Sequence, residues 1–267
     1  MQKTLKKYFP VFLLPTVIAF CIAFIIPFVT GLYLSFCDFT TVSNAKFVGF
    51  ANYIKAFSSS QRFGQAFGFT TLFTIISIIT VNIIAFTLAY LLTRKIKGTN
   101  FFRTVFFMPN LIGGIVLGYT WQSMINSILA KYGTTLVADA KYGFIGLIIL
   151  MNWQMIGYMM IIYIAGLQNV PTELIEASKI DGATKWQTLR HVTIPMVMPS
   201  ITICTFLTLS NSFKLYDQNL ALTAGAPMHK TEMLALNIVN SFYGRSNFEG
   251  VGQAKAVMFF IIVACIA

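Results

Sequence analysis

The chain has 267 residues, of which 57% are hydrophobic and only 10% are charged, and its formal net charge is +11. A soluble domain carries about 25% charged residues, so this composition excludes a protein whose whole surface faces water. The sequence has no zinc-knuckle spacing and no interleaving of basic and aromatic residues, and most basic residues lie between apolar runs. We therefore attribute the positive charge to membrane topology and anionic lipid, and predict a lipid bilayer rather than a nucleic acid as partner.

The first apolar run follows a cluster of lysines at the N-terminus. Lys3, Lys6 and Lys7 precede a run at residues 11–36. A secretory signal peptide has an apolar region of only about 7–15 residues and a small-residue cleavage site, and neither feature is found here. We therefore expect a retained first transmembrane helix.

Five further apolar runs lie at residues 70–93, 104–128, 143–168, 196–222 and 251–267. At about 1.5 Å per residue, most of them can cross the roughly 30 Å of hydrocarbon in a bilayer. The last run is short and contains Gln253 and Lys255, so we expect its helix to be incomplete. The sequence has no internal repeat. It predicts an all-α membrane protein with one domain over residues 1–267 and six transmembrane helices.

Six spans place both ends of the chain on the same side of the membrane. Ten Lys and Arg residues lie in the N-terminal tail and in the 94–103 and 169–195 loops, against eight in the opposite loops. The clusters at residues 3–7 and 94–103 lie next to helix ends, where positive charge favours the cytoplasmic side. The pattern therefore predicts a cytoplasmic N-terminus.

The predicted spans are almost free of charged residues, and only Lys214 and Asp217 are candidates for a charge inside a helix. A transporter driven by a proton gradient usually buries a carboxylate or histidine that carries the proton. The chain also lacks a G-x-x-x-x-G-K-[ST] phosphate loop and an H-E-x-x-H metalloprotease motif. We therefore expect no catalytic residue and no metal site, and infer that the energy for transport comes from another chain.

The segment at residues 169–195 is too long for a simple connection between helices, for which about 2–8 residues are usual. Pro171 or Thr172 can open a helix here, because proline fits a first helical turn and threonine can cap it. Gly182 suits the left-handed position that follows a helix C-terminus. We therefore predict a separate helix within this segment, followed by a second amphipathic turn at residues 184–192.

The predicted helix has a mixed surface. It combines apolar residues such as Leu174 and Ile180 with acidic residues at its N-terminal end, which the helix dipole favours. Small side chains at Ala177 and Ser178 would let a partner approach closely if the helix docks in a groove. A helix with this surface can equally lie on the membrane. The pattern alone leaves both alternatives open.

The run E-A-S-K-I-D-G-A at residues 176–183 resembles the EAA motif of bacterial ABC importer permeases. Ser178 stands in place of the second alanine of the motif, and Ile194-Pro195 stands in place of its later Leu-Pro; both departures are conservative. In that family the motif forms the coupling helix, which sits in a cleft of the cytoplasmic ATPase. The resemblance implies ATPase-coupling roles for Glu173, Glu176, Ala177, Ser178, Asp181, Gly182 and Ala183.

Four further strings resemble the sugar-uptake branch of this family, in the order in which the family has them. They are F-V-G-F-A-N-Y at residues 47–53, F-R-T-V-F-F-M-P at 102–109, A-G-L-Q-N-V-P at 165–171, and D-Q at 217–218 with L-T-A-G-A-P at 222–227. They argue against an amino acid, phosphate or a polyamine as substrate. The resemblance implies the type I ABC importer permease fold with a cytoplasmic coupling helix.

The same resemblance implies the partners of the chain. They are a second, homologous permease subunit, two copies of a cytoplasmic ATPase that bind ATP and magnesium, and an extracytoplasmic solute-binding protein that touches the 224–250 loop. The binding protein would deliver a sugar or oligosaccharide. This chain would hold no cofactor and would not be an enzyme. The complex would lie in a bacterial cell membrane and work by alternating access.

In this family the helices that flank the EAA segment line the translocation path. A sugar site needs aromatic faces for the ring and amides or hydroxyls for the OH groups. The candidate path residues in these helices are Asn152, Trp153, Tyr158, Ser210, Asn211, Lys214, Tyr216 and Asp217. Two alternatives stay open: the aromatic residues can anchor helix ends at the membrane surface, and Lys214 and Asp217, three residues apart, can pair with each other.

Overall fold

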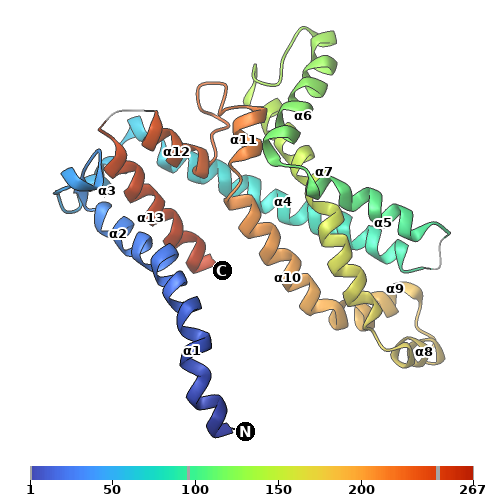
Figure 1. Cartoon of the computed structure of the whole chain (residues 1–267). Helices are drawn as coiled ribbons and strands as arrows, with labels where there is room; N and C mark the ends of the chain where they lie inside the picture. Colours follow the sequence, from blue (N-terminus) through green and yellow to red (C-terminus); the bar gives the residue numbers. More distant parts are fainter. Residues whose placement is uncertain (1, 95–96, 245–246, 267) are drawn as a thin grey trace. The chain divides into compact units, whose positions relative to one another are not determined.

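Residues 2–94, 97–244 and 247–266 are described by a computed structural model (Figure 1). These residues form two compact units, one comprising the chain up to Phe63 together with Asn237–Ile266 and the other comprising Gly64–Leu236. The single membrane domain over residues 1–267 stays a prediction, because a division into compact units does not test it. Hydropathy identifies the spans, but it does not tell which spans pack on each other, because lipid-facing and protein-facing surfaces are both apolar.

The first unit holds both ends of the described chain. Its elements are α1 (Gln2–Phe20), a π-helical turn (Cys21–Ile25), α2 (Ile26–Leu34), β1 (Cys37–Asp38), a 3₁₀ turn (Val42–Asn44), β2 (Lys46–Phe47), α3 (Ala51–Ala56), a second 3₁₀ turn (Ser59–Gln61), most of α12 (Leu234–Tyr243) and α13 (Glu249–Ile266). The two short strands pair antiparallel, with Cys37 opposite Phe47. Apart from these strands, the secondary structure of the described residues is helical, which agrees with the predicted all-α class.

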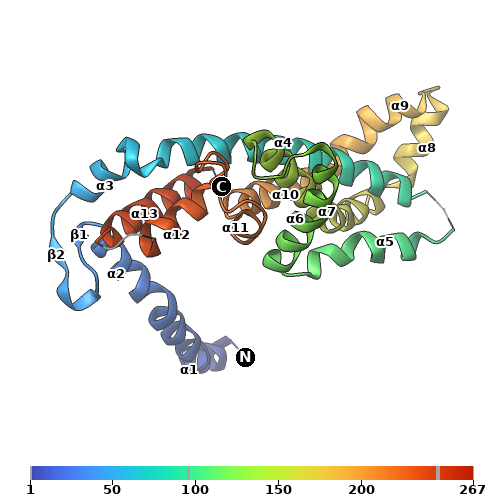
Figure 2. The same cartoon turned by 90° about the horizontal axis from the view of Figure 1, so that it is seen from above.

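The second unit contains most of α4 and the chain up to the start of α12. Its elements are α4 (Phe63–Leu92), α5 (Thr99–Phe107), a 3₁₀ turn (Met108–Leu111), α6 (Gly114–Leu129), a 3₁₀ turn (Ala130–Tyr132), α7 (Ala140–Gln168), α8 (Thr172–Ile180), α9 (Lys185–Thr188), a π-helical turn (Leu189–Thr193), α10 (Ile194–Phe213) and α11 (Asp217–Leu222). Figures 1 and 2 both place α5, α7 and α10 near one another within this unit.

Five helical stretches of the described chain are long and apolar enough to cross a membrane, and a bent helix pair would make a sixth. They are Phe9–Leu34, Phe63–Leu92, Ala140–Gln168, Lys185–Phe213 and Glu249–Ile266. The predicted runs at 11–36, 70–93, 143–168 and 251–267 each fall on one of them. Two of the predicted spans have different limits in the structure.

The run at residues 104–128 is not one straight helix. Thr99–Leu111 and Gly114–Tyr132 form two helical pieces that meet at an angle of 102°. Between them Ile112 and Gly113 are extended, with ψ angles of 134° and 140°. Pro109 lies in the 3₁₀ turn before this break, where it cannot donate a helical hydrogen bond. The hydropathy of the sequence does not reveal the bend, because both pieces are apolar.

The run at residues 196–222 begins earlier and ends earlier than predicted. One helical stretch runs from Lys185 through the π-helical turn to Phe213, and Asp217–Leu222 forms the separate helix α11. Pro195 lies in the first turn of α10, where the π-helical turn already breaks the regular hydrogen-bond pattern. A proline that usually marks a helix start is therefore accommodated inside a longer helix.

The core of the second unit is centred on α7. Its buried side chains include Leu150, Met155, Met159 and Tyr163. α5 packs on α7 at Gly157, where a Cβ atom would collide with the carbonyl oxygen of Phe106. Close helix contacts at small residues are typical of membrane proteins. This contact fixes the position of the break that follows α5.

The first unit contains a fully buried lysine. Lys255 on α13 donates to the side-chain oxygens of Asn237 (2.9 Å) and Ser241 (2.6 Å) and to Gln61, whose Oε1 and backbone oxygen both lie 3.2 Å away. A buried ammonium group needs such oxygen partners within a membrane. The residue therefore joins α13 to α12 and to the turn before α4.

Candidate functional site

Helix α8 is the predicted separate helix of the 169–195 segment. It begins at Thr172 and ends at Ile180, and Gly182 has a φ of +77°, as expected for the residue that ends such a helix. The N–H groups of Asp181, Gly182 and Ala183 close the last turn with bonds of 2.9–3.1 Å to helix carbonyls. Thr172 is the first helical residue and provides no side-chain cap, because Pro171 occupies the capping position.

Most of the predicted coupling residues on α8 point away from the chain. Glu173, Glu176, Ala177, Asp181 and Gly182 are exposed and Ala183 is half-buried. The most exposed apolar residue of the helix is Ile180, which has 86% of its surface accessible, and Leu174 has 43% accessible. The described chain therefore leaves an apolar and acidic face of α8 without a partner.

Ser178 has a different orientation from its neighbours. It is buried, and its hydroxyl donates to the Ile175 carbonyl (2.8 Å) and lies 2.9 Å from the hydroxyl of Thr188 on α9. The small side chain of Ser178 was predicted to let a partner approach closely. Because the side chain faces α9 instead, it holds α8 onto the start of the following helix.

The helix after α8 begins with a reciprocal cap at Thr184. The Gln187 side chain accepts from the Thr184 N–H (2.7 Å), and the Thr184 hydroxyl accepts from the Gln187 N–H (3.3 Å). This T-x-x-Q pattern is a capping box, a local helix-start signal on which the predicted turn at residues 184–192 did not rest. The predicted turn at 184–192 is therefore the first part of the stretch that reaches Phe213.

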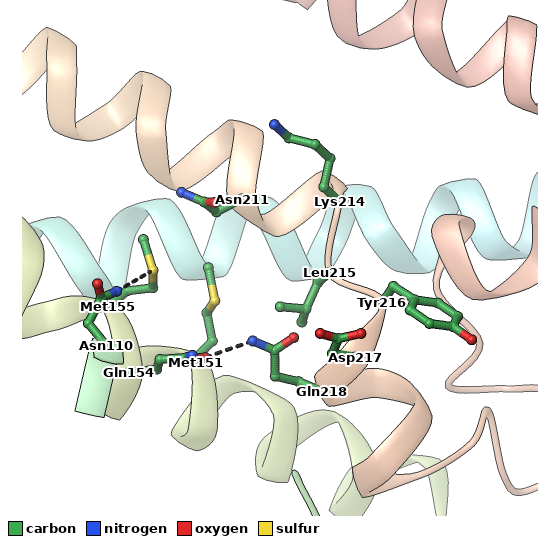
Figure 3. A pocket seen from close by; sticks show the side chains of 10 residues that line it. All are labelled: Asn110, Met151, Gln154, Met155, Asn211, Lys214, Leu215, Tyr216, Asp217 and Gln218. Atoms are coloured by element: carbon green, nitrogen blue, oxygen red, sulfur yellow. Dashed lines mark hydrogen bonds between the residues drawn. The ribbon is translucent and has the colours of Figure 1, made fainter. Parts of the chain in front are cut away.

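A polar cavity of about 300 Å³ lies at the other end of this stretch (Figure 3). Residues from the turn after α5, from α7, from the end of α10 and from the start of α11 enclose it. They are Asn110, Met151, Gln154, Met155, Asn211, Lys214, Leu215, Tyr216, Asp217 and Gln218. α11 is held in place by α6, because Gly114 and Gly118 leave room for Asp217 and Ala221.

A pair of glutamine amides forms one wall of the cavity. Gln218 Nε2 donates to Gln154 Oε1 at 2.7 Å, and Gln154 Nε2 lies 3.4 Å from the carbonyl oxygen of Ile112. Ile112 lies in the break between α5 and α6. The amides thus connect α11, α7 and the bent helix pair. Figure 3 shows the bond between Gln218 and Gln154.

Lys214 and Asp217 line the cavity without pairing with each other. Lys214 is exposed and Asp217 is half-buried, and in Figure 3 the lysine side chain extends away from the carboxylate. Among the described residues, His229 Nδ1 lies 3.3 Å from the Glu232 carboxylate, and no such contact joins Lys214 to Asp217. Of the two open alternatives for these residues, the structure shows no pair, because α10 ends at Phe213 and helical i,i+3 spacing does not extend from Lys214 to Asp217.

Half of the eight candidate path residues lie at the cavity. These are Asn211, Lys214, Tyr216 and Asp217. Asn152, Trp153, Tyr158 and Ser210 are absent from its lining. Within a helix, a residue one position away from a lining residue points about 100° away from it, so proximity in sequence is a poor guide to the lining.

The residues outside the lining have other contacts. Asn152 is buried and donates to the Thr80 hydroxyl (3.0 Å) and the Ile148 carbonyl (2.8 Å). The ring centroids of Trp153 and Trp121 are 5.5 Å apart. Those of Tyr158 and Phe107 are 6.5 Å apart. Gln154 and Gln218 are not among the eight predicted path residues, although both are amides within predicted apolar runs, as Asn152 is.

The sequence of residues 99–267 matches the family described as binding-protein-dependent transport system inner membrane component. The chain is 42% identical over 264 residues to the probable starch degradation products transport system permease protein AmyD of Thermoanaerobacterium thermosulfurigenes, covering 96% of this chain and 90% of the relative. It is 32% identical over 278 residues to the multiple sugar-binding transport system permease protein MsmF of Streptococcus mutans serotype c, covering 100% of this chain and 95% of the relative.

A solved structure has the same fold. It is the crystal structure of a bacterial ABC transporter involved in the import of the acidic polysaccharide alginate, with a TM-score of 0.83, 20% identity, and coverage of 99% of this chain and 94% of that chain. The predicted type I fold is thereby confirmed. On the family match and the 42% identical relative, the chain belongs to the inner membrane components of binding-protein-dependent transport systems and is a permease subunit of an ABC importer.

Proposed function

We propose that this chain forms half of the translocation path for a sugar or oligosaccharide and is driven by separate ATPase subunits. The observation that carries the proposal is the helical stretch from Lys185 to Phe213, which has α8 at one end and the polar cavity at the other. With 29 residues at about 1.5 Å each, the stretch is roughly 40 Å long. One element therefore links a docking surface to a substrate site.

The chemistry of the cavity supports a saccharide as substrate. Asn110, Gln154 and Gln218 offer amide donors and acceptors, Asp217 offers a carboxylate acceptor, and Tyr216 adds an aromatic ring. Such groups match the hydroxyls and the apolar ring face of a sugar. Two relatives that are at least 30% identical to the chain carry names that refer to starch degradation products and to multiple sugars. An amino acid, phosphate or polyamine remains the competing substrate class.

The unpartnered face of α8 supports docking on an ATPase. Glu173, Glu176 and Asp181 supply acidic groups around the exposed Ile180. An exposed short helix with an apolar anchor and charged neighbours fits a groove in a partner protein. We assign this groove to one of two cytoplasmic ATPase copies, which would bind the ATP and magnesium. This chain itself would hold no cofactor and hydrolyse nothing.

The remaining partners complete the importer. A second, homologous permease would form the other half of the path, and an extracytoplasmic binding protein would deliver the substrate near the 224–250 loop. We place the N-terminus in the cytoplasm, because the lysine cluster at residues 3–7 precedes the first span. The same orientation puts α8 on the cytoplasmic side, where an ATPase can reach it.

The proposed mechanism transmits a movement along one helix. Closure of the two ATPases on ATP would displace α8. The packing of α8 against α9 and the turn that follows it, to which the Ser178–Thr188 hydroxyl contact adds, would pass the displacement to α10. At the far end, Lys214 and α11 would shift against Gln154 on α7, which opens or closes the cavity. Hydrolysis would then return the path to the inward-facing state.

A purification from the native host tests this proposal first. The tagged chain is extracted in mild detergent, the subunits that copurify are identified by mass spectrometry, and ATPase activity is measured. We expect a second permease and an ATPase, with activity stimulated by the binding protein loaded with a saccharide. The charge reversal Glu176→Lys should abolish the stimulation, whereas Lys131→Gln, an exposed change in the turn after α6, should not alter it.

Two results would contradict the proposal. A chain that purifies alone and takes up sugar along an ion gradient in vesicles would be a secondary transporter. A complete complex whose ATPase responds to an amino acid or polyamine, and to no saccharide, would support the importer assignment. It would contradict a sugar as the substrate.

A further inference from the structure

A short segment of the first unit lies between two membrane-spanning helices and has an apolar surface of its own. It connects the end of α2 at Leu34 to the start of α4 at Phe63 and contains β1, β2 and α3. The string F-V-G-F-A-N-Y at residues 47–53 falls within it, and the proposed function gives this string no role. Because spans flank the segment on both sides, it has to lie close to a membrane surface.

One side of α3 is fixed to the helices around it. The Asn52 amide is buried and donates to the carbonyls of Ser35 (3.1 Å) and Cys37 (2.8 Å), just after α2. The Tyr53 hydroxyl lies 2.7 Å from the Ser35 hydroxyl. Gly250, in the first turn of α13, leaves room for both Asn52 and the Cys37 carbonyl. α3 is therefore held where α2 ends and α13 begins (Figure 1).

The opposite side of this segment is apolar and aromatic. We define the aromatic face as Phe47, Phe50, Ile54 and Phe57, whose accessible fractions are 69%, 67%, 73% and 67%. Burying apolar surface stabilises by about 25 cal/mol per Å², so four such residues strongly favour leaving water. Their position at the ends of two spans puts them at the depth where aromatic side chains gather in membrane proteins.

The charges around the aromatic face are mostly positive. Lys46 and Lys55 are exposed beside it, and Arg62 is half-buried. Residues 35–62 contain a single acidic residue, Asp38. An apolar helix face bordered by lysines is the pattern of a helix that lies in a membrane surface. The lysines match the negative charge of phospholipid headgroups.

We propose that the aromatic face is an interfacial lipid-binding surface, which inserts into the headgroup region of the bilayer and favours anionic phospholipids. Its rings enter the boundary between headgroups and acyl chains, while the two lysines reach the phosphates. The contacts of Asn52 and Gly250 make this surface continuous with the ends of α2 and α13, so the bound lipid sets the depth of both helices. Lipid is favoured over a protein partner because the surface adjoins the ends of two spans.

Photocrosslinking in the assembled importer tests this assignment. The photoreactive amino acid p-benzoylphenylalanine replaces Phe50 or Phe57 in separate variants, and a third variant carries it at Ser43, in the exposed polar turn between the strands. The complex is reconstituted in vesicles of phosphatidylcholine with phosphatidylglycerol and irradiated with and without the binding protein. Adducts are identified by mass spectrometry of the chain.

We expect phospholipid adducts at positions 50 and 57 and at least about fivefold fewer at position 43, because a ring at the interface lies among acyl chains. Replacing Lys46 and Lys55 together by glutamine should lower the ratio of phosphatidylglycerol to phosphatidylcholine adducts at position 50 at least about twofold, because each lysine near an anionic surface attracts such lipids. Normal uptake by this double variant would show that it folds.

Three outcomes would overturn the proposal. Adducts at positions 50 and 57 with the binding protein or with the second permease would make the face a protein interface. An absence of adducts at both positions, with normal expression of the variants, would place the face in water. An unchanged ratio of phosphatidylglycerol to phosphatidylcholine adducts in the lysine variant would contradict the preference for anionic phospholipid.

Discussion

The two ends of the stretch from Lys185 to Phe213 differ in how their polar groups are used. At the α8 end, backbone groups and Ser178 are satisfied internally, and the charged side chains of Glu173 and Glu176 face outward. At the cavity end, the Gln154 and Gln218 side chains bond to each other across two helices. The first arrangement leaves a surface for another chain, and the second forms a site for a small molecule.

Because of this difference, we expect substitutions at the two ends to impair transport in different ways. A change at α8 should separate ATP hydrolysis from transport while leaving the cavity intact. A change at the cavity should alter transport of the substrate while the response of the ATPase to its docking partner persists. Four tests sharpen or contradict this comparison, and they are given from the largest expected effect to the smallest.

Gly182→Val should have the largest effect. A β-branched residue at a φ of +77° is strained by about 1–2 kcal/mol or more, which would displace the end of α8. We expect uptake into proteoliposomes to fall more than about tenfold, with the complex still assembled, because the coupling surface moves. Gly182→Asn is the matched control, since asparagine tolerates this conformation, and it should retain most uptake. Full uptake by the valine variant would refute the coupling role of this position.

Gln218→Leu should have a moderate effect confined to the cavity. It removes the 2.7 Å hydrogen bond to Gln154 and an amide that faces the substrate. A lost hydrogen bond of this kind costs about 0.5–1.5 kcal/mol, so uptake at saturating binding protein should fall about two- to tenfold. Gln154→Leu should have a similar effect, and the double variant should be less impaired than the sum. Additive effects would mean that the two amides act separately.

Lys214→Gln and Asp217→Asn test whether the two charges are coupled. Because they form no ion pair, their effects on uptake should add, with an interaction energy below about 0.5 kcal/mol in a double-mutant cycle. Each single change should lower uptake only a few-fold. An interaction energy above about 1 kcal/mol would indicate a direct pair in the working importer.

Ser178→Ala should have the smallest effect. It removes the contact with the Thr188 hydroxyl, which lies 2.9 Å away, and this contact stabilises the junction of α8 and α9 by about 0.5–1.5 kcal/mol. We expect uptake to fall less than about twofold, with the melting temperature of the complex lowered by a few degrees. The family motif, which has alanine at this position, fits this small effect. A loss as large as that of Gly182→Val would make the hydroxyl itself essential for coupling.

Much of the fold could be predicted from the sequence because it follows from local properties. Long apolar runs gave most of the spans, since the bilayer fixes the length of a crossing helix. The limits of α8 followed from Pro171 and Gly182, whose backbone preferences act within a few residues. The resemblance around residues 176–183 identified the family without any contact being known.

The tertiary structure alone decided which polar residues meet. Asn152 was a sound candidate for the path, yet its amide bonds to Thr80, and Gln154, two residues later, faces the cavity instead. Lys214 and Asp217 are close in sequence but separated by the end of α10. Hydropathy and spacing place a residue along a helix, whereas the direction of its side chain depends on where that helix breaks and on which neighbour it packs against. For this protein, the sequence therefore determined most of the spans, the separate helix α8 and the family, and the packing of α7, α10 and α11 determined the cavity.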